Sequence, residues 1–168
     1  MIAVLPANAP QTLGAAFKHI NAVTAPTIDD LKVIVLVEAA GLALYAHSAT
    51  GTDHQGVRDL LNDNGREEMV HANRVADVIE ILSGEAYRPP EAANNPYLQG
   101  DMPPPAPLTA QGLAKLAQSE FDGDALYEGW AASISNEAAA ALLRQNGVEE
   151  SDHGNRLLAA SVLLAAYG

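Results

Sequence analysis

The chain contains no cysteine, few aromatic residues and few basic residues. Without cysteine it cannot form disulfides, iron–sulfur clusters, zinc–thiolate sites, c-type haem attachments or thiol nucleophiles. Any metal ion must therefore be held by histidine and carboxylate side chains. Aromatic residues make up only 5% of the 168 residues, whereas alanine occurs 32 times. Because alanine is the best helix former and lets helices approach closely, this composition predicts an all-α helix bundle.

The scarcity of positive charge restricts the partners of the protein. Only 9 Lys and Arg side chains stand against 21 Asp and Glu, which gives a formal net charge of -12. An acidic surface disfavours nucleic acid, whose phosphate backbone binds basic patches, and it disfavours an anionic membrane surface. We therefore expect neither nucleic acid nor membrane as a partner, and the excess of acid needs another explanation.

The sequence also lacks a clear targeting signal or membrane span. Residues Met1–Pro10 have no basic stretch ahead of an apolar one, as a signal peptide would. The most hydrophobic run, Val33–Ala46, is too short to cross a bilayer, and it carries Glu38 in its middle. A glutamate in such a run is costly unless it has a partner. These features predict a soluble, cytoplasmic protein.

The chain aligns with itself without gaps at an offset of 82 residues. The motif E-x-x-G-x-A-L-Y occurs at 38–45 and again at 120–127. The longer motif N-G-x-E-E-x-x-H-x-N-R occurs at 64–74 and again at 146–156. Two motifs shared at one offset indicate an internally duplicated pair of helices.

The duplication predicts a single domain, residues 1–168, with four long helices. A first helix pair covers 28–84 and a second covers 108–168. A crossover over 85–107 separates them, and because it contains seven prolines we expect it to be extended rather than helical. Residues 1–26 are expected to form either an arm on the outside of the bundle or a partly disordered end.

Local signals predict the ends of the helices. Thr27 and Asp30 are spaced as an approximate capping box for the first helix. Asp53 is a suitable N-cap for the second helix, and Gly84 a suitable stop. The pairs Asn64-Gly65 and Asn146-Gly147 are poor in a helix interior, so we expect a kink or a π-bulge there.

The duplicated motifs place six metal-binding side chains at one height. In each helix pair two glutamates lie 30 residues apart, Glu38 and Glu68 in the first pair and Glu120 and Glu150 in the second. Because the turn lies halfway between them, an antiparallel hairpin places the two side chains at the same height along the helices. Each second helix adds a histidine three residues after its glutamate, on the same helix face. One glutamate from each of two helices and E-x-x-H from the other two is the arrangement of dinuclear iron or manganese carboxylate sites in helix bundles. The predicted ligands are Glu38, Glu68, His71, Glu120, Glu150 and His153.

Further residues are expected around these ligands. Three are candidates for catalytic roles. Tyr45 and Tyr127 follow Glu38 and Glu120 by seven residues, so they lie on the same helix face as these ligands. They would form a hydrogen bond to a carboxylate or supply electrons, and each is equally explained as a tyrosine of the core. Asp124 lies one turn beyond Glu120 and is a candidate extra acid or proton relay.

Glu67 and Glu149 are rival ligands because each lies four residues before its histidine, but they point about 100° away from Glu68 and Glu150, so we expect them behind the ligands or at the surface. Asn64 and Asn146 are expected to project inward and to donate hydrogen bonds around the ligands.

The segment Arg66–Arg74 resembles the second helix of bacterioferritins and rubrerythrins, and Glu38 followed by Tyr45 is also similar to both. The resemblance covers about residues 28–168 and places the chain with the ferritin-like superfamily. It implies a four-helix bundle with a long crossover between the second and third helices and a non-haem dinuclear site. It also implies an oxidoreductase of the ferroxidase or peroxidase type, with Fe(II), O₂ and hydrogen peroxide as reactants. Two iron ions are the expected cofactor, with manganese possible.

The sequence departs from these families in ways that change the expectation. It has no cysteine for a rubredoxin-like electron donor, and position 123 is glycine where rubrerythrins carry an extra glutamate. Only fifteen residues follow His153, which leaves no room for the fifth helix of cage ferritins. We therefore expect a homo-oligomer, a dimer rather than a 24-subunit cage, without haem. An iron storage or sequestration module and a dimanganese catalase-like protein remain as alternatives.

Overall fold

The computed structural model describes residues 1–100 and 102–167, and the regular structure in these residues is helical. The prediction of an all-α fold is confirmed. Two short 3₁₀ helices, η1 (Ala92–Asn94) and η2 (Pro96–Leu98), lie between the third and fourth of five α-helices. The α-helices are α1 (Leu13–Ile20), α2 (Ile28–Ala49), α3 (Gln55–Ser83), α4 (Ala110–Ser133) and α5 (Glu137–Tyr167).

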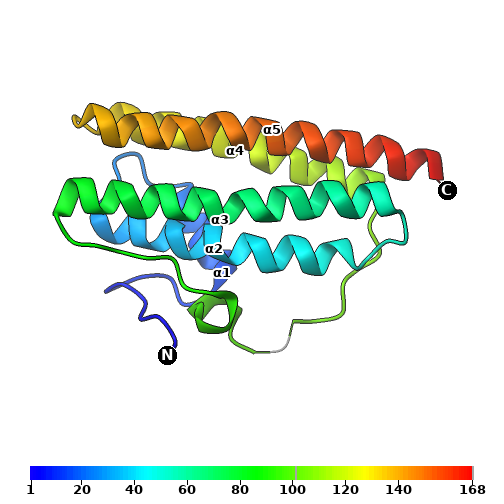
Figure 1. The fold of residues 1–168 in the computed structure, drawn as a ribbon, viewed down its shortest axis with the longest axis horizontal. Helices are drawn as coiled ribbons and strands as arrows, with labels where there is room; N and C mark the ends of the chain where they lie inside the picture. Colours follow the sequence, from blue (N-terminus) through cyan, green and yellow to red (C-terminus); the bar gives the residue numbers. More distant parts are fainter. Residues whose placement is uncertain (101, 168) are drawn as a thin grey trace.

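The four long helices form two hairpins that pack on each other. α2 lies along α3, α4 lies along α5, and contacts between α3 and α5 join the two hairpins (Figure 1). Among the described residues, α2 and α4 do not form such a close pair. The chain between α3 and α4 passes beneath the hairpins from one end of the molecule to the other (Figure 1).

The helix ends follow local hydrogen bonding. Thr27 and Asp30 form the predicted capping box, with the Thr27 Oγ1 accepting from the Asp30 backbone N at 3.2 Å. The N-cap of α3 is His54, whose Nδ1 accepts from the Val57 backbone N at 3.2 Å, so the prediction of Asp53 was wrong by one residue. Gly84 ends α3 with φ +75°, a conformation that glycine adopts without strain.

Two segments contain more structure than expected. The N-terminal arm includes α1, which packs against α2 and buries Ala16 and Ile20. The crossover includes η1 and η2, because a proline such as Pro96 is compatible with the first residue of a helical turn. Between them, the buried Asn95 donates from Nδ2 to the Leu36 carbonyl at 2.7 Å, which ties the crossover to α2.

The core consists of two apolar clusters with a polar level between them. One cluster packs the ends of α2 and α3 around Leu31 and Ile79 together with α1, and it includes Trp130. The other packs the opposite ends of the long helices around Leu61 and Leu157. The buried charged side chains, such as Glu68 and Glu150, belong to neither cluster. They lie between the two clusters, so apolar packing covers this polar level from both ends of the long helices.

The backbone stays α-helical through both Asn-Gly pairs, so the expected π-bulge is wrong. Glycine serves close packing instead. A Cβ added to Gly65 would lie 2.9 Å from the Tyr45 Cβ and 3.3 Å from the Leu42 carbonyl oxygen. A Cβ added to Gly147 would lie 3.2 Å from the Tyr127 Cβ. Each glycine therefore lets the two helices of its hairpin approach at the level of the tyrosine.

α2 is the one helix among the described residues that is long and apolar enough to cross a membrane. The helix Ile28–Ala49 is longer than the run Val33–Ala46 that the sequence suggested, and it contains an apolar window of 18 residues. Of that window, 56% is buried inside the protein, and buried core helices of soluble proteins have the same length and composition. The structure is therefore compatible with a soluble protein, and the absence of a membrane partner stays a prediction.

Replacing Gly65 by alanine tests its packing role. The added methyl group has no free space, so Gly65→Ala should lower the free energy of unfolding by about 1–3 kcal/mol. Gly129→Ala is the matched control, because Gly129 is exposed within α4 and nothing lies within 4 Å of an added Cβ. It should stabilise the protein by about 0.5–1 kcal/mol. Urea denaturation measures both, and equal effects would contradict the packing role.

Candidate metal centre

The structure brings the six predicted ligands together at the polar level of the core. Each long helix contributes: α2 and α4 supply one glutamate each, and α3 and α5 supply a glutamate and a histidine each. Both histidines are fully buried, and the glutamate side chains are at most 13% exposed. Apolar packing above and below shields them from water, which makes their mutual charge interactions strong.

The Nδ1 atom of His71 faces three carboxylates. It lies 3.0 Å from the nearest oxygen of Glu150 and 3.8 Å from oxygens of both Glu38 and Glu68. Three carboxylates from three different helices thus converge on one imidazole nitrogen.

The Nδ1 atom of His153 has the equivalent surroundings in the other half. It lies 3.4 Å from oxygens of both Glu68 and Glu150 and 4.0 Å from an oxygen of Glu120. The two imidazole rings are stacked with centroids 5.0 Å apart. Glu68 and Glu150 are common to both sets, whereas Glu38 and Glu120 belong to one set each.

This cluster can hold metal. One donor atom from each of four side chains lies within 4.8 Å of the others, from Glu68, His71, Glu150 and His153. The Nδ1 of His153 is buried without a hydrogen-bond partner, a state that is costly for a polar atom and is relieved by coordination. Imidazole nitrogen and carboxylate oxygen together suit iron or manganese. The donor set therefore fits such a metal.

In the absence of a cation, three of the four carboxyl groups resist ionisation. Burial, together with the charge of Glu150, raises the pKa of Glu38 and Glu68. Burial and the contact with Glu150 raise the pKa of Glu120 to about 9. Burial also opposes the ionisation of Glu150, but His153 and His71 hold its pKa at about 2. Protons therefore neutralise part of the cluster when no metal does.

The two tyrosines cross between the halves of the molecule. The Tyr127 hydroxyl donates to Glu38 Oε1 at 2.7 Å, and the Tyr45 hydroxyl donates to Glu120 Oε1. Each tyrosine thus orients the unshared glutamate of the opposite hairpin. The expectation that these phenols bond to a carboxylate is met, although their role in catalysis stays a prediction.

The outer side of each histidine is held by an ion pair. His71 Nε2 lies 3.1 Å from Glu149 Oε2, and Arg74 donates from Nη2 to Glu149 Oε1 at 2.9 Å. Partial burial opposes ionisation of Glu149, but Arg74 lowers its pKa below the ordinary value. An ionised carboxylate accepts the Nε2 proton, so Nδ1 is the nitrogen that faces the cluster and that would bind a metal ion.

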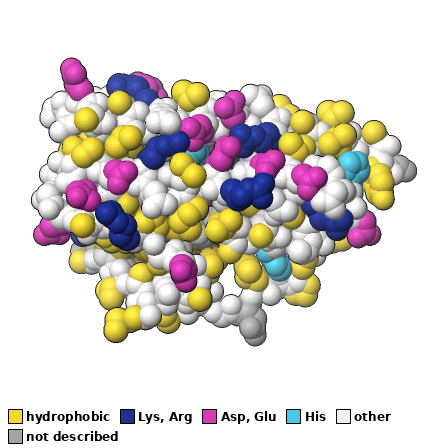
Figure 2. Space-filling model, in the orientation of Figure 1, with side chains coloured by type: hydrophobic (Ala, Val, Ile, Leu, Met, Phe, Trp, Pro, Cys, Tyr) yellow, Lys and Arg dark blue, Asp and Glu magenta, His cyan; other side chains and the backbone are white. Residues whose placement is uncertain are grey.

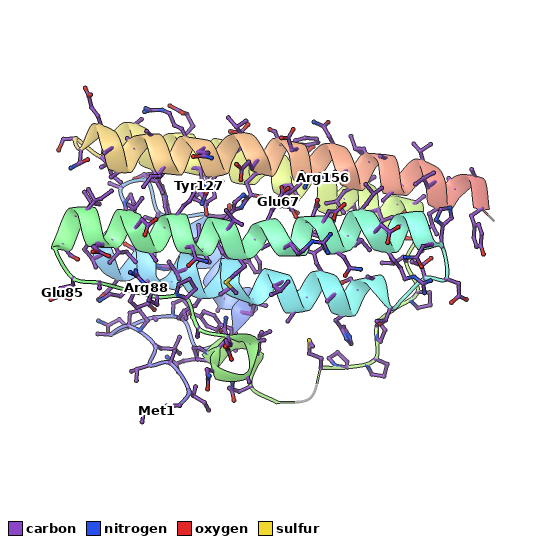
Figure 3. The ribbon with its side chains drawn as sticks, viewed as in Figure 1. Met1, Glu67, Glu85, Arg88, Tyr127 and Arg156 are labelled. Atoms are coloured by element: carbon purple, nitrogen blue, oxygen red, sulfur yellow. The ribbon has the colours of Figure 1, made fainter. Side chains whose placement is uncertain are left out.

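The other half repeats this arrangement. His153 Nε2 lies 3.1 Å from Glu67 Oε2, and Arg156 donates from Nη2 to Glu67 Oε1 at 2.9 Å. Glu67 and Arg156 face each other between α3 and α5 (Figure 3). Charged side chains of both signs accordingly gather along the α3–α5 face (Figure 2). Each glutamate contacts the histidine of the other repeat.

Two buried asparagines complete the crossed network. Asn64 donates from Nδ2 to the His153 carbonyl at 3.2 Å, and Asn146 donates from Nδ2 to the His71 carbonyl at 3.2 Å. The same asparagines accept hydrogen bonds from Arg156 and Arg74 respectively. They fix the backbone at the histidines, as expected of residues that face inward.

Asp124 forms a hydrogen bond next to this network. Its Oδ2 accepts from the Ser151 hydroxyl at 2.7 Å, and no hydrogen bond within the described residues links it to the six predicted ligands. Its role as an extra acid or proton relay stays a prediction.

Sequence reasoning assigned no role to the two arginines. Arg74 and Arg156 end the duplicated N-G-x-E-E-x-x-H-x-N-R motif, so their repetition was the available signal. Their importance depends on ion pairs across the hairpins, which spacing within one helix does not reveal.

No protein-family model, curated protein or solved structure matches the chain. The assignment of the site therefore depends on its geometry and on the chemistry of its donor atoms.

The raised carboxyl pKa values predict how the metal-free protein responds to pH. The folded state keeps protons on Glu38, Glu68 and Glu120 that the unfolded chain releases above about pH 4.5. Folding stability must therefore fall as the pH rises from about 5 to 9, by up to about 1.4 kcal/mol per pH unit for each such proton.

Thermal melts of metal-free protein between pH 5 and 9 measure this slope. Glu120→Gln removes one titrating group with little change in shape, so it should flatten the decline. A melting temperature that stays constant or rises over this range in the wild-type protein would show that these carboxyls ionise normally.

The ion pairs behind the histidines should control metal affinity. Glu149→Gln removes the charged acceptor of His71 Nε2 and should weaken metal binding about 10- to 100-fold. Glu128→Gln is the matched control, because Glu128 forms an exposed ion pair with Arg144 on the same hairpin. Titration with Co(II) followed by absorbance measures both, and equal affinities in the two variants would refute the positioning role of Glu149.

Proposed function

We propose that the chain is a ferritin-like, non-haem dinuclear iron protein that oxidises Fe(II) or reduces peroxide or O₂. The observation that carries the proposal is the paired donor set. Each histidine Nδ1 faces three carboxylates, and the two sets share Glu68 and Glu150. Two groups of donor atoms that have two carboxylates in common suit a pair of metal ions, because a shared carboxylate can bind both ions.

The residues that would hold the ions follow from this division. Glu38 and His71 would serve one ion, Glu120 and His153 the other, and Glu68 and Glu150 both. Bound iron would supply redox chemistry toward O₂ or peroxide, which no thiol of this cysteine-free protein can supply. Four carboxylates also balance the charge of two divalent ions, so a loaded site is neutral inside an apolar core.

The protein's own residues orient the donors and exclude water. Tyr45 and Tyr127 hold the two unshared glutamates through their hydroxyl groups. Glu149 and Glu67 hold the two imidazoles with Nδ1 directed inward. The four carboxylates also border a cavity, which gives small reactants a route to the site.

The same donors suit manganese, and a storage module would use the same site for uptake alone. Metal analysis of natively purified protein distinguishes iron from manganese. Light scattering distinguishes the proposed dimer from a cage, since a dimer encloses no storage volume.

Removal of a shared ligand tests the proposal directly. Wild-type protein loaded anaerobically with Fe(II) should bind about two irons per chain and develop a ferric absorbance band on addition of peroxide or air. Glu68→Ala should lose most of this iron, because both sets lose a donor. Glu80→Ala, an exposed position on the same helix that pairs with Arg88, should retain it. Failure of the wild-type protein to take up iron would refute the proposed function.

A further inference from the structure

A cavity of about 490 Å³ opens between α2 and α4, the two long helices that do not pack closely on each other. α1 covers part of it, with Phe17 and Ile20 in its wall. The helices on the other side of the cluster are closed by the ion pairs of Arg74 and Arg156. The metal cluster therefore has one closed face and one face that meets a cavity.

The cavity reaches all four ligand glutamates but neither ligand histidine. The histidines approach from α3 and α5, so they leave the α2–α4 side of the cluster free. Two neighbouring glycines, Gly41 and Gly123, also line the cavity and add no side chain in front of the carboxylates. A molecule in the cavity would thus lie directly against the open side of the centre.

The size and walls of the cavity exceed what O₂, peroxide or Fe(II) requires. Pockets for small organic molecules measure about 300–1,000 Å³ and are lined mainly by apolar side chains. Here Ile34, Val37, Leu44, Leu116 and Leu126 supply the aliphatic part of the wall beyond α1. Water gains little against such walls, whereas an apolar molecule gains the free energy of burying its surface.

The charges around the cavity select against an anionic molecule. Among the described residues, the side chains that line it include no lysine, arginine or histidine, and its charged members are the four glutamates. While both bound ions are divalent, the four glutamates balance them, so no net positive charge remains for an acid headgroup. A carboxylate buried there would be unpaired and costly.

We propose that this cavity binds an uncharged, mostly apolar organic molecule, such as a medium-chain alcohol or aldehyde, against the open face of the metal centre. The statement about the metal face rests on the proposed function. Binding within the cavity rests on its walls alone, so the two can fail separately.

Octan-1-ol and octanoate are suitable probes because they share a chain length and differ in charge. Isothermal titration of the metal-loaded protein should show octan-1-ol binding and at least about tenfold weaker binding of octanoate. Leu44→Trp places a larger side chain in the cavity and should weaken octan-1-ol binding about tenfold or more. Leu42→Trp is the matched control, because Leu42 is exposed on the same helix and does not line the cavity.

The outcomes separate the two proposals. Metal uptake by all variants, with octan-1-ol binding lost only in Leu44→Trp, supports the cavity assignment. Normal metal uptake without octan-1-ol binding in wild-type protein overturns it and leaves the proposed function intact. The same holds if the wild-type protein sediments as a dimer whose α2–α4 face excludes the alcohol. Octanoate binding as tight as that of octan-1-ol overturns the uncharged class. Octan-1-ol binding by protein that takes up no metal supports the cavity and overturns the proposed function.

Discussion

Four carboxylates buried at one level of an apolar core repel one another, and most of the structure can be understood from this constraint. Burial strengthens the repulsion because the interior screens charge poorly. Protons relieve it in the metal-free protein, where the pKa of Glu120 rises to about 9. Two divalent ions would relieve it more completely. The excess of acid in the sequence is thus partly internal, and it does not by itself describe the surface.

The supporting contacts cross between the two halves of the chain. Tyr45 bonds to Glu120, Asn64 bonds to the backbone of His153, and Glu67 contacts the imidazole of His153. The equivalent residues of the second repeat make the equivalent contacts to the first. Neither helix pair therefore builds a complete half-site from its own residues. A duplication that preserves both partners of each contact explains why the two motifs recur together at one offset.

The two faces of the candidate metal centre differ in their surroundings. On the α3–α5 side, two arginine–glutamate pairs lie behind the histidines and close the core. On the α2–α4 side, the helices stand apart and apolar side chains line a cavity that ends at the carboxylates. The rigid side positions the ligands, whereas the open side sets which molecules reach them. The two arginine–glutamate pairs join α3 to α5, whereas no such ion pair joins α2 to α4 in the part of the chain that the structure describes.

The sequence by itself determined the four long helices, their pairing into hairpins and the common level of the six predicted ligands. These follow from helix periodicity and from the equal spacing of each glutamate from its turn, which are local properties. It did not predict α1 or the two 3₁₀ helices. It did not determine that both histidines would face Glu68 and Glu150, nor that Glu67 and Glu149 would contact the histidines. A helical wheel shows on which side of its own helix a residue lies, but it does not show which residue of another helix lies opposite. The ion pairs of Arg74 and Arg156, the hydrogen bond between Asp124 and Ser151 and the cavity also depend on how the helices pack. Those features are decided by distances between helices, which only the tertiary structure sets.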